Sequence, residues 1–130
     1  MRVLLVDNHT IVRVALRLLL EDEPDIEVVG EASDGRQGVE LTGQLHPDIV
    51  LMDVSMPIMD GLQATRAIHA AHPEVCVIGL SMYEMHEQAA AMRAAGALEY
   101  VTKSAPPGQV VEVMRACYTR RRDPLPPLAA

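Results

Sequence analysis

The sequence predicts an α/β protein of the doubly wound class, in which five parallel strands alternate with five helices. Short runs rich in Val, Ile and Leu alternate with longer segments whose apolar residues recur every three or four positions. Most of the short runs lack polar alternation, which is typical of strands buried on both faces of a parallel sheet. The length of 130 residues fits one compact domain, and the only aromatic residues are three tyrosines, so the core must be aliphatic.

The predicted elements follow one another without interruption. The strands are expected at Val3–Val6, Ile26–Gly30, Ile49–Met52, Val75–Leu80 and Leu98–Thr102. The helices are expected at Ile11–Leu20, Gly35–Leu45, Gly61–Ala71, Glu84–Ala95 and Pro107–Tyr118. Because crossovers between parallel strands are right-handed, this alternation places helices on both faces of the sheet. The expected strand order is 2-1-3-4-5, the order of flavodoxin-like folds.

Each predicted helix shows an apolar face or a helix-forming composition. The residues expected to share a face are Ile11, Ala15, Leu18 and Leu19 in the first helix, Gly38, Leu41 and Leu45 in the second, Ala64, Thr65 and Ile68 in the third, and Val110, Val113, Met114 and Cys117 in the last. The fourth helix is rich in Ala and Met. Residues that favour turns separate the elements, among them Pro24, Asp34-Gly35 and Gly96.

Composition narrows the function classes. The net charge of −7 argues against non-specific binding of nucleic acid by this domain. The first apolar run ends at Asp7, too early for a signal peptide, and no apolar run reaches membrane-spanning length, so a cytoplasmic protein is expected. Cys76 and Cys117 show no metal spacing and are interpreted as buried free thiols. Residues 1–119 are predicted to form the domain, and residues 120–130 a tail or linker stump.

Polar side chains stand at the carboxyl ends of four predicted strands. Asp7 and Asn8 follow the first strand, Asp53 the third, Ser81 the fourth and Lys103 the fifth. Taken singly, such residues are more often helix caps or solvated charges. Because the carboxyl ends of parallel strands meet at one edge, we expect these side chains to converge on a ligand site.

The residue types in this set suit phosphoryl transfer. Carboxylate and amide oxygens are ligands for Mg²⁺. An aspartate can act as the nucleophile and form an aspartyl phosphate. Developing charge on the phosphoryl oxygens needs a cation and hydrogen-bond donors, which Lys103 and Ser81 can supply.

The segments around these residues resemble the response-regulator receiver domains of bacterial two-component systems over residues 2–119. The segments that carry the resemblance are Leu4–His9, Asp48–Gly61, Leu80–Met82 and Ala95–Lys103. The run from Asp53 to Gly61 is the most specific of them. The pieces at His9 and Leu80–Met82 resemble the LuxR/NarL-type subgroup, whose members often carry a helix-turn-helix output domain.

The resemblance implies a signalling switch and not an enzyme. Asp53 would accept a phosphoryl group from a sensor histidine kinase, Lys103 would pair with its oxygens, and a shift of Ser81 toward it would change the rotamer of Tyr100. The implied Mg²⁺ ligands are Asp7, Asn8, Asp53 and the backbone carbonyl of Ser55. Other implied partners are a second copy in a weak homodimer, and DNA only through an output domain outside this chain; no membrane partner is expected.

Two of the departures from the family pattern bear on the site. The family usually has an acid where this chain has Asn8, and the lost charge should weaken Mg²⁺ binding by about 1–2 kcal/mol, or roughly tenfold. Many members have proline, often after a cis bond, where Ser104 follows Lys103. A cis bond before a residue other than proline costs about 2.5–4 kcal/mol, so the geometry of this peptide stays open.

Two alternatives compete with the switch. A phosphatase that uses an aspartate nucleophile would need a second acid two residues later, where this chain has Ser55. A degenerate receiver would act only as an interaction module, with Asn8 marking a lost metal site. Incubation with a small phosphodonor and Mg²⁺ separates the three hypotheses. The switch predicts a stable mass gain, the phosphatase steady phosphate release, and the degenerate receiver no change.

Overall fold

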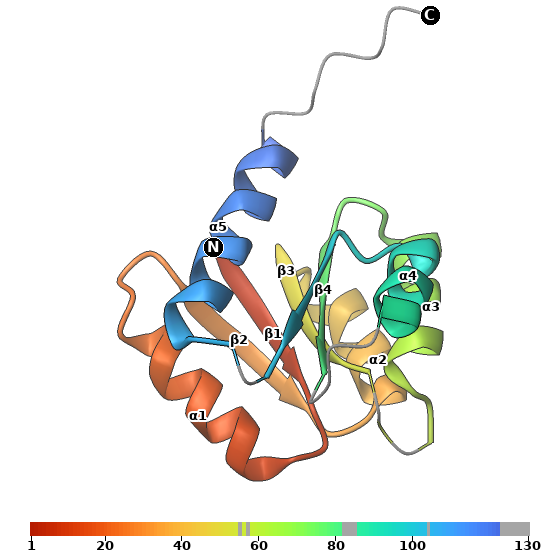
Figure 1. Cartoon of the computed structure of the whole chain (residues 1–130), viewed down its shortest axis with the longest axis horizontal. Helices are drawn as coiled ribbons and strands as arrows, with labels where there is room; N and C mark the ends of the chain where they lie inside the picture. The colour runs from red at the N-terminus through yellow and green to blue at the C-terminus, as the bar shows by residue number, and fades with distance from the viewer. Residues whose placement is uncertain (55, 57, 82–85, 104, 123–130) are drawn as a thin grey trace, which may run out of the picture.

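The computed structural model describes residues 1–54, 56, 58–81, 86–103 and 105–122. Five parallel strands form one sheet in the order β2-β1-β3-β4-β5, which confirms the predicted fold and strand order (Figure 1). The strands are β1 (Arg2–Val6), β2 (Glu27–Ala32), β3 (Ile49–Asp53), β4 (Cys76–Ser81) and β5 (Glu99–Thr102). The helices are α1 (Thr10–Glu21), α2 (Gly35–Leu45), α3 (Gly61–Ala71), α4 (His86–Ala95) and α5 (Pro107–Arg122).

The sequence pattern located α2 and α3 at their observed bounds, and most other ends within two residues. An aspartate N-cap precedes each of these helices, and its side chain accepts a hydrogen bond from a backbone N–H of the first turn: Asp34 from Gln37, and Asp60 from Gln63. The predicted start of the fourth helix, Glu84, lies outside the described residues. The predicted end of the last helix is wrong, because α5 continues to Arg122. Residues 120–122 are therefore helical, and the rest of the predicted tail, 123–130, lies outside the described part.

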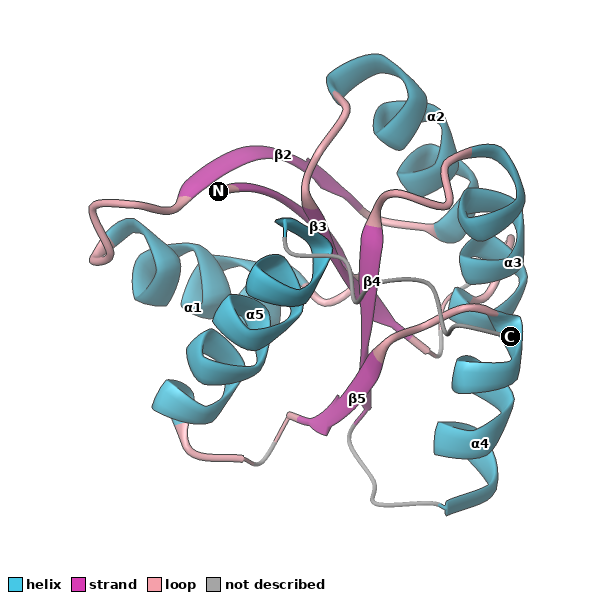
Figure 2. Ribbon diagram, turned by 90° about the horizontal axis from the view of Figure 1, so that it is seen from above, coloured by secondary structure: helices cyan, strands magenta, loops and turns pink. Residues whose placement is uncertain are grey.

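The helices cover both faces of the sheet. Figure 2 shows α1 and α5 on one side and α2, α3 and α4 on the other. Side chains of the inner strands alternate between the two cores. Val3, Leu5 and Leu51 pack with α5, whereas Leu4 and Val50 pack on the opposite face. Both cores are almost wholly aliphatic, as the composition predicted.

The predicted apolar face of α1 is wrong as a packing face. Ile11 is 84% exposed and Leu18 is 65% exposed. The helix instead turns Leu16, Leu19 and the fully buried Leu20 toward the sheet. Apolar residues cover a broad arc of this helix, opposite a polar stripe that holds Arg13, Arg17 and Glu21. Periodicity alone therefore did not select which part of that arc is buried.

Two further predictions can be compared with the structure. Cys76 and Cys117 are both buried and free, as predicted. Burial raises the pKa of the Cys117 thiol to about 11, so this thiol stays protonated at neutral pH. Within the described ranges, no helix combines the length and the apolar character needed to cross a bilayer.

Candidate functional site

Four of the predicted polar residues meet at the carboxyl edge of the sheet. Asp7 follows β1, Asp53 ends β3, Ser81 ends β4 and Lys103 follows β5. The strand registers place these positions within two residues of one another along neighbouring strands. Asp7, Asp53 and Ser81 are at most 6% exposed. Such burial is unusual for the two aspartates, because acidic side chains are almost never fully buried unless they are paired.

Lys103 lies between the two carboxylates. Its Nζ atom is 2.7 Å from Asp7 Oδ2 and 3.3 Å from Asp53 Oδ1, and its side chain is 8% exposed. The buried group thus brings two carboxylates together with one ammonium. Buried like charges repel each other unless a cation lies close, so the edge is suited to bind a further cation.

The four predicted metal ligands differ in burial and in whether the structure describes them. Asp7 and Asp53 are brought together, with buried carboxylates at the same edge. Asn8 follows Asp7 directly and is exposed. Ser55, whose carbonyl was the fourth predicted ligand, lies outside the described residues, as does Ser104 with the peptide bond that follows Lys103.

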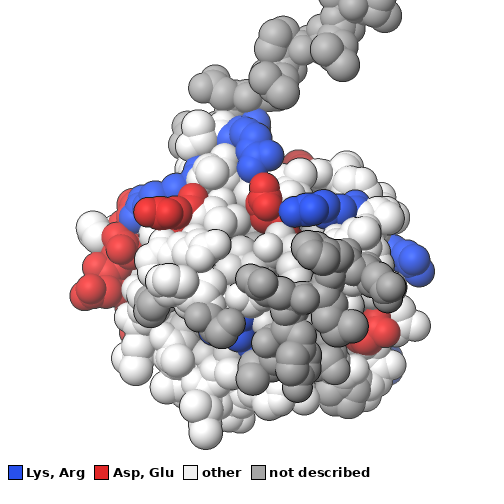
Figure 3. Space-filling model, viewed as in Figure 1, with Lys and Arg blue, Asp and Glu red and all other residues white. Residues whose placement is uncertain are grey.

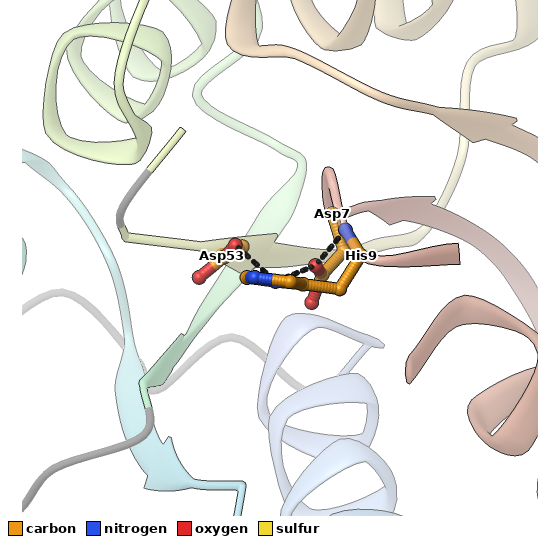
Figure 4. A group of neighbouring side chains, drawn as sticks. All are labelled: Asp7, His9 and Asp53. Carbon is orange, nitrogen blue, oxygen red and sulfur yellow. Dashed lines mark hydrogen bonds and ion pairs between the residues drawn. The ribbon is translucent and has the colours of Figure 1, made fainter. Parts of the chain in front are cut away.

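Sequence reasoning missed a histidine beside the carboxylates. His9 Nδ1 is 3.1 Å from Asp7 Oδ1 and 3.8 Å from Asp53 Oδ2, and Figure 4 shows the ring between the two acids. The backbone N–H of His9 also donates to Asp7 Oδ1 at 2.8 Å. The sequence signal for this residue is its position two residues after Asp7, just beyond the end of the first strand.

A glutamine joins the two predicted switch residues. Gln88 in α4 accepts a hydrogen bond from Ser81 Oγ at 3.2 Å and one from Tyr100 OH at 3.0 Å, both at its Oε1 atom. Ser81 ends β4 and Tyr100 lies in β5, so one side chain of α4 connects two strands. Nothing in the sequence around Gln88 distinguishes it from an ordinary helix-surface residue.

The loop after Asp53 approaches the edge closely. A side chain at Gly61 would place its Cβ atom 2.1 Å from the Asp53 carbonyl oxygen, so only glycine fits there. Ile58 has φ of 69°, a backbone region that β-branched residues rarely adopt. The Asp53–Gly61 motif is thus partly a steric requirement for bringing α3 against the end of β3.

Comparison with known proteins agrees with this geometry. A family model described as the response regulator receiver domain matches residues 3–115. The transcriptional regulatory protein LiaR of Bacillus subtilis (strain 168) is 42% identical over 115 residues, which cover 88% of this chain and 54% of LiaR. The chain thus spans about half the length of the curated relatives it matches.

Two solved structures are also similar. The LuxR-family two-component response regulator from Aurantimonas sp. SI85-9A1 is 36% identical with a TM-score of 0.87, and the match covers 91% of this chain and 84% of that one. The signal receiver domain of the response regulator NarL from Mycobacterium tuberculosis is 28% identical with a TM-score of 0.87, covering 91% and 95% of the two chains. The chain therefore belongs to the receiver domains of response regulators, within the LuxR/NarL-type subgroup.

Proposed function

We propose that this receiver accepts a phosphoryl group on Asp53 from a sensor histidine kinase and passes the signal on through its α4–β5 face. The observation that carries the proposal is the position of Lys103 Nζ between the buried carboxylates of Asp7 and Asp53. In the proposed reaction a carboxylate oxygen of Asp53 bonds to phosphorus while the bond from phosphorus to the kinase imidazole nitrogen breaks. The electron pair of that bond stays on the imidazole, and Lys103 attracts the phosphoryl oxygens.

The donor set at the edge fits Mg²⁺, a hard cation that prefers oxygen ligands. Asp7, Asp53, Asn8 and the Ser55 carbonyl would hold it. The two buried carboxylates on either side of the Lys103 ammonium support this assignment. When bound, Mg²⁺ supplies positive charge for the phosphoryl oxygens. The role of Asp7 is then to hold both Lys103 and the cation at the edge.

The proposed output begins at Ser81 and Gln88. A phosphoryl group on Asp53 offers oxygen acceptors to the Ser81 hydroxyl, which at present donates to Gln88. If Ser81 turns toward that group, Gln88 keeps Tyr100 as its hydroxyl donor. In the second arrangement the Ser81 hydroxyl has exchanged Gln88 for the phosphoryl group as its acceptor, and the new charge biases the equilibrium between the two.

The test is phosphorylation by acetyl phosphate with Mg²⁺, followed by mass spectrometry of the intact protein. The wild-type chain should gain one phosphoryl group, and Asp53→Asn should gain none. Asp60→Asn is the matched control, because Asp60 is a nearby helix cap and asparagine caps equally well. Phosphorylation of Asp53→Asn at the wild-type rate would show that another residue is the acceptor. Steady phosphate release would favour the phosphatase alternative, and an inert wild-type chain would favour the degenerate receiver.

The proposed partners extend beyond the chain. We propose that the receiver regulates transcription through an output domain joined after α5, with residues beyond the helix as the linker, and that DNA is contacted only by that domain. Two buried free thiols suit a reducing, cytoplasmic location. Receivers of this kind are signalling proteins, and no catalytic turnover of an external substrate is proposed.

We also propose a weak homodimer. The exposed apolar row Ile11, Val14 and Leu18 on α1 supports it, since rows of this kind are rarely left against water. Figure 3 shows that charged side chains on this face spread across its upper part, while the coloured and white atoms at the lower left include few of them. Sedimentation should show more dimer when beryllofluoride is added, and Leu18→Glu should abolish that increase. An unchanged distribution in the wild-type chain would remove this part of the proposal.

A further inference from the structure

The ring of His9 has no structural task in the helix that it precedes. His9 is the N-cap residue of α1, yet its side chain makes no capping hydrogen bond. The side chain is 56% exposed, so it does not belong to either core. It nevertheless points toward the carboxyl edge of the sheet, with Nδ1 beside Asp7 and Asp53 (Figure 4).

The distances around His9 match those between ligands of one ion. Ligand atoms about 2.1 Å from the same cation and at right angles to each other lie about 3 Å apart. The separation of His9 Nδ1 from Asp7 Oδ1 is 3.1 Å. One ligand atom each from Asp7, His9 and Asp53 lies within 4.8 Å of the others.

We propose that His9 Nδ1 is a direct ligand in the cation site and that it gives this receiver an affinity for borderline divalent ions such as Zn²⁺. The inference rests on the proposed cation site at Asp7 and Asp53. It adds a nitrogen donor that the oxygen-only ligand set of Asp7, Asn8, Asp53 and Ser55 does not contain.

The nitrogen donor changes which ion the edge prefers. Mg²⁺ prefers oxygen ligands and retains several waters, whereas imidazole suits Zn²⁺ and other transition ions. Asn8 strengthens the contrast, because a neutral amide in place of an acid removes charge that a hard ion needs more than a borderline one does. Two carboxylates and one imidazole are a donor set that transition ions accept readily.

A different role for His9 makes the opposite prediction. The ring contacts the same carboxylates that would bind a cation, so it could instead occupy the place of that cation as an ion-pair partner. Removing it would then strengthen the binding of every divalent ion. The sign of the effect on Zn²⁺ separates a ligand from a competitor.

The experiment compares Zn²⁺ and Mg²⁺ binding to the wild-type chain, His9→Asn and His69→Asn by calorimetry at about pH 8, where an ordinary imidazole is neutral. Asparagine is a preferred N-cap, so α1 should begin as before in the first variant. His69 is exposed in the last turn of α3, and its variant corrects for Zn²⁺ bound by surface histidines. The ¹⁵N spectrum of labelled histidine provides a direct readout of ligation.

His9→Asn should weaken Zn²⁺ binding by about tenfold or more, the scale on which losing a supporting contact weakens metal sites, and leave Mg²⁺ binding nearly unchanged. Zn²⁺ should shift the Nδ1 resonance of His9, and Mg²⁺ should not. Tighter binding of both ions to His9→Asn, or an unshifted resonance in the presence of bound Zn²⁺, would overturn the inference while leaving the Mg²⁺ site intact. A wild-type chain that binds neither ion would overturn the cation site itself, and this inference with it.

Discussion

Among the described residues, several cationic side chains lie between two carboxylates, and two of these clusters differ sharply in burial. Lys103 lies between Asp7 and Asp53, and none of these side chains is more than 8% exposed. In the second cluster, Arg115 of α5 contacts Glu23 and Asp25, and these side chains are 36–54% exposed.

Burial decides what each cluster can do. The exposed cluster joins α5 to the connection between α1 and β2, and water screens its charges, so its effect on stability is small. The buried cluster holds charges that water cannot screen, so each charge depends on the others. Such a group is poised to respond to a new cation or a phosphoryl group, which a solvated group is not.

The largest expected effect follows from removing the buried ammonium. Lys103→Met should lower the free energy of unfolding by about 3 kcal/mol, because it leaves two buried carboxylates beside each other without that charge. Urea denaturation of the metal-free protein measures the change. Arg115→Met is the matched control, since it removes the cation of the exposed cluster, and it should change stability far less. Equal losses in the two variants would contradict the role given to burial.

A second variant tests whether the loss comes from repulsion. Adding Asp53→Asn to Lys103→Met should recover about 1–2 kcal/mol, because one of the two crowded carboxylates becomes neutral. The double-mutant cycle, measured by the same urea denaturation, gives the coupling energy. Strict additivity of the two substitutions would show that Lys103 and Asp53 do not interact, and that lost packing explains the effect of Lys103→Met.

A third acid should increase the repulsion within the buried cluster when no metal is bound. Asn8→Asp should tighten Mg²⁺ binding by roughly tenfold, which corresponds to about 1.4 kcal/mol, and should lower the melting temperature slightly when no metal is present. Calorimetric Mg²⁺ titration followed by thermal unfolding in a chelator measures both. If the two proteins bind Mg²⁺ equally, Asn8 does not set the strength of the site.

The smallest expected effect concerns the exposed cluster and pH. The Arg115 guanidinium lowers the pKa of Asp25 below its ordinary value of 3.8. The stabilisation from this pair is therefore present above pH 3.8 and is lost as the pH falls through the lower pKa of the folded protein. Arg115→Met should remove this dependence and the salt sensitivity that accompanies it, as measured by unfolding at two ionic strengths. The stability change caused by Lys103→Met should be nearly the same at the two ionic strengths, because water and salt do not reach the buried cluster.

The sequence by itself determined the fold class, the strand order and the identity of the buried charges. Strands with unbroken apolar runs need a sheet that is covered on both faces, because both of their faces must be buried. A parallel sheet brings the carboxyl ends of its strands to one edge. Asp7, Asp53, Ser81 and Lys103 could therefore be selected by their positions alone. The motif from Asp53 to Gly61 was recognised through the family resemblance, and the structure supplies the physical reason for its glycine, because a Cβ atom at Gly61 would collide with the backbone of Asp53.

Tertiary structure alone decided which side of α1 is buried and which polar side chains join the site. Ile11 and Leu18 are as apolar as Leu19 and Leu20, and only the position of the helix over the sheet determines which of them meet the core. His9 and Gln88 act through side-chain directions, His9 toward the carboxylates and Gln88 toward Ser81 and Tyr100. Local sequence does not encode such directions, because they depend on how elements distant in the chain pack together.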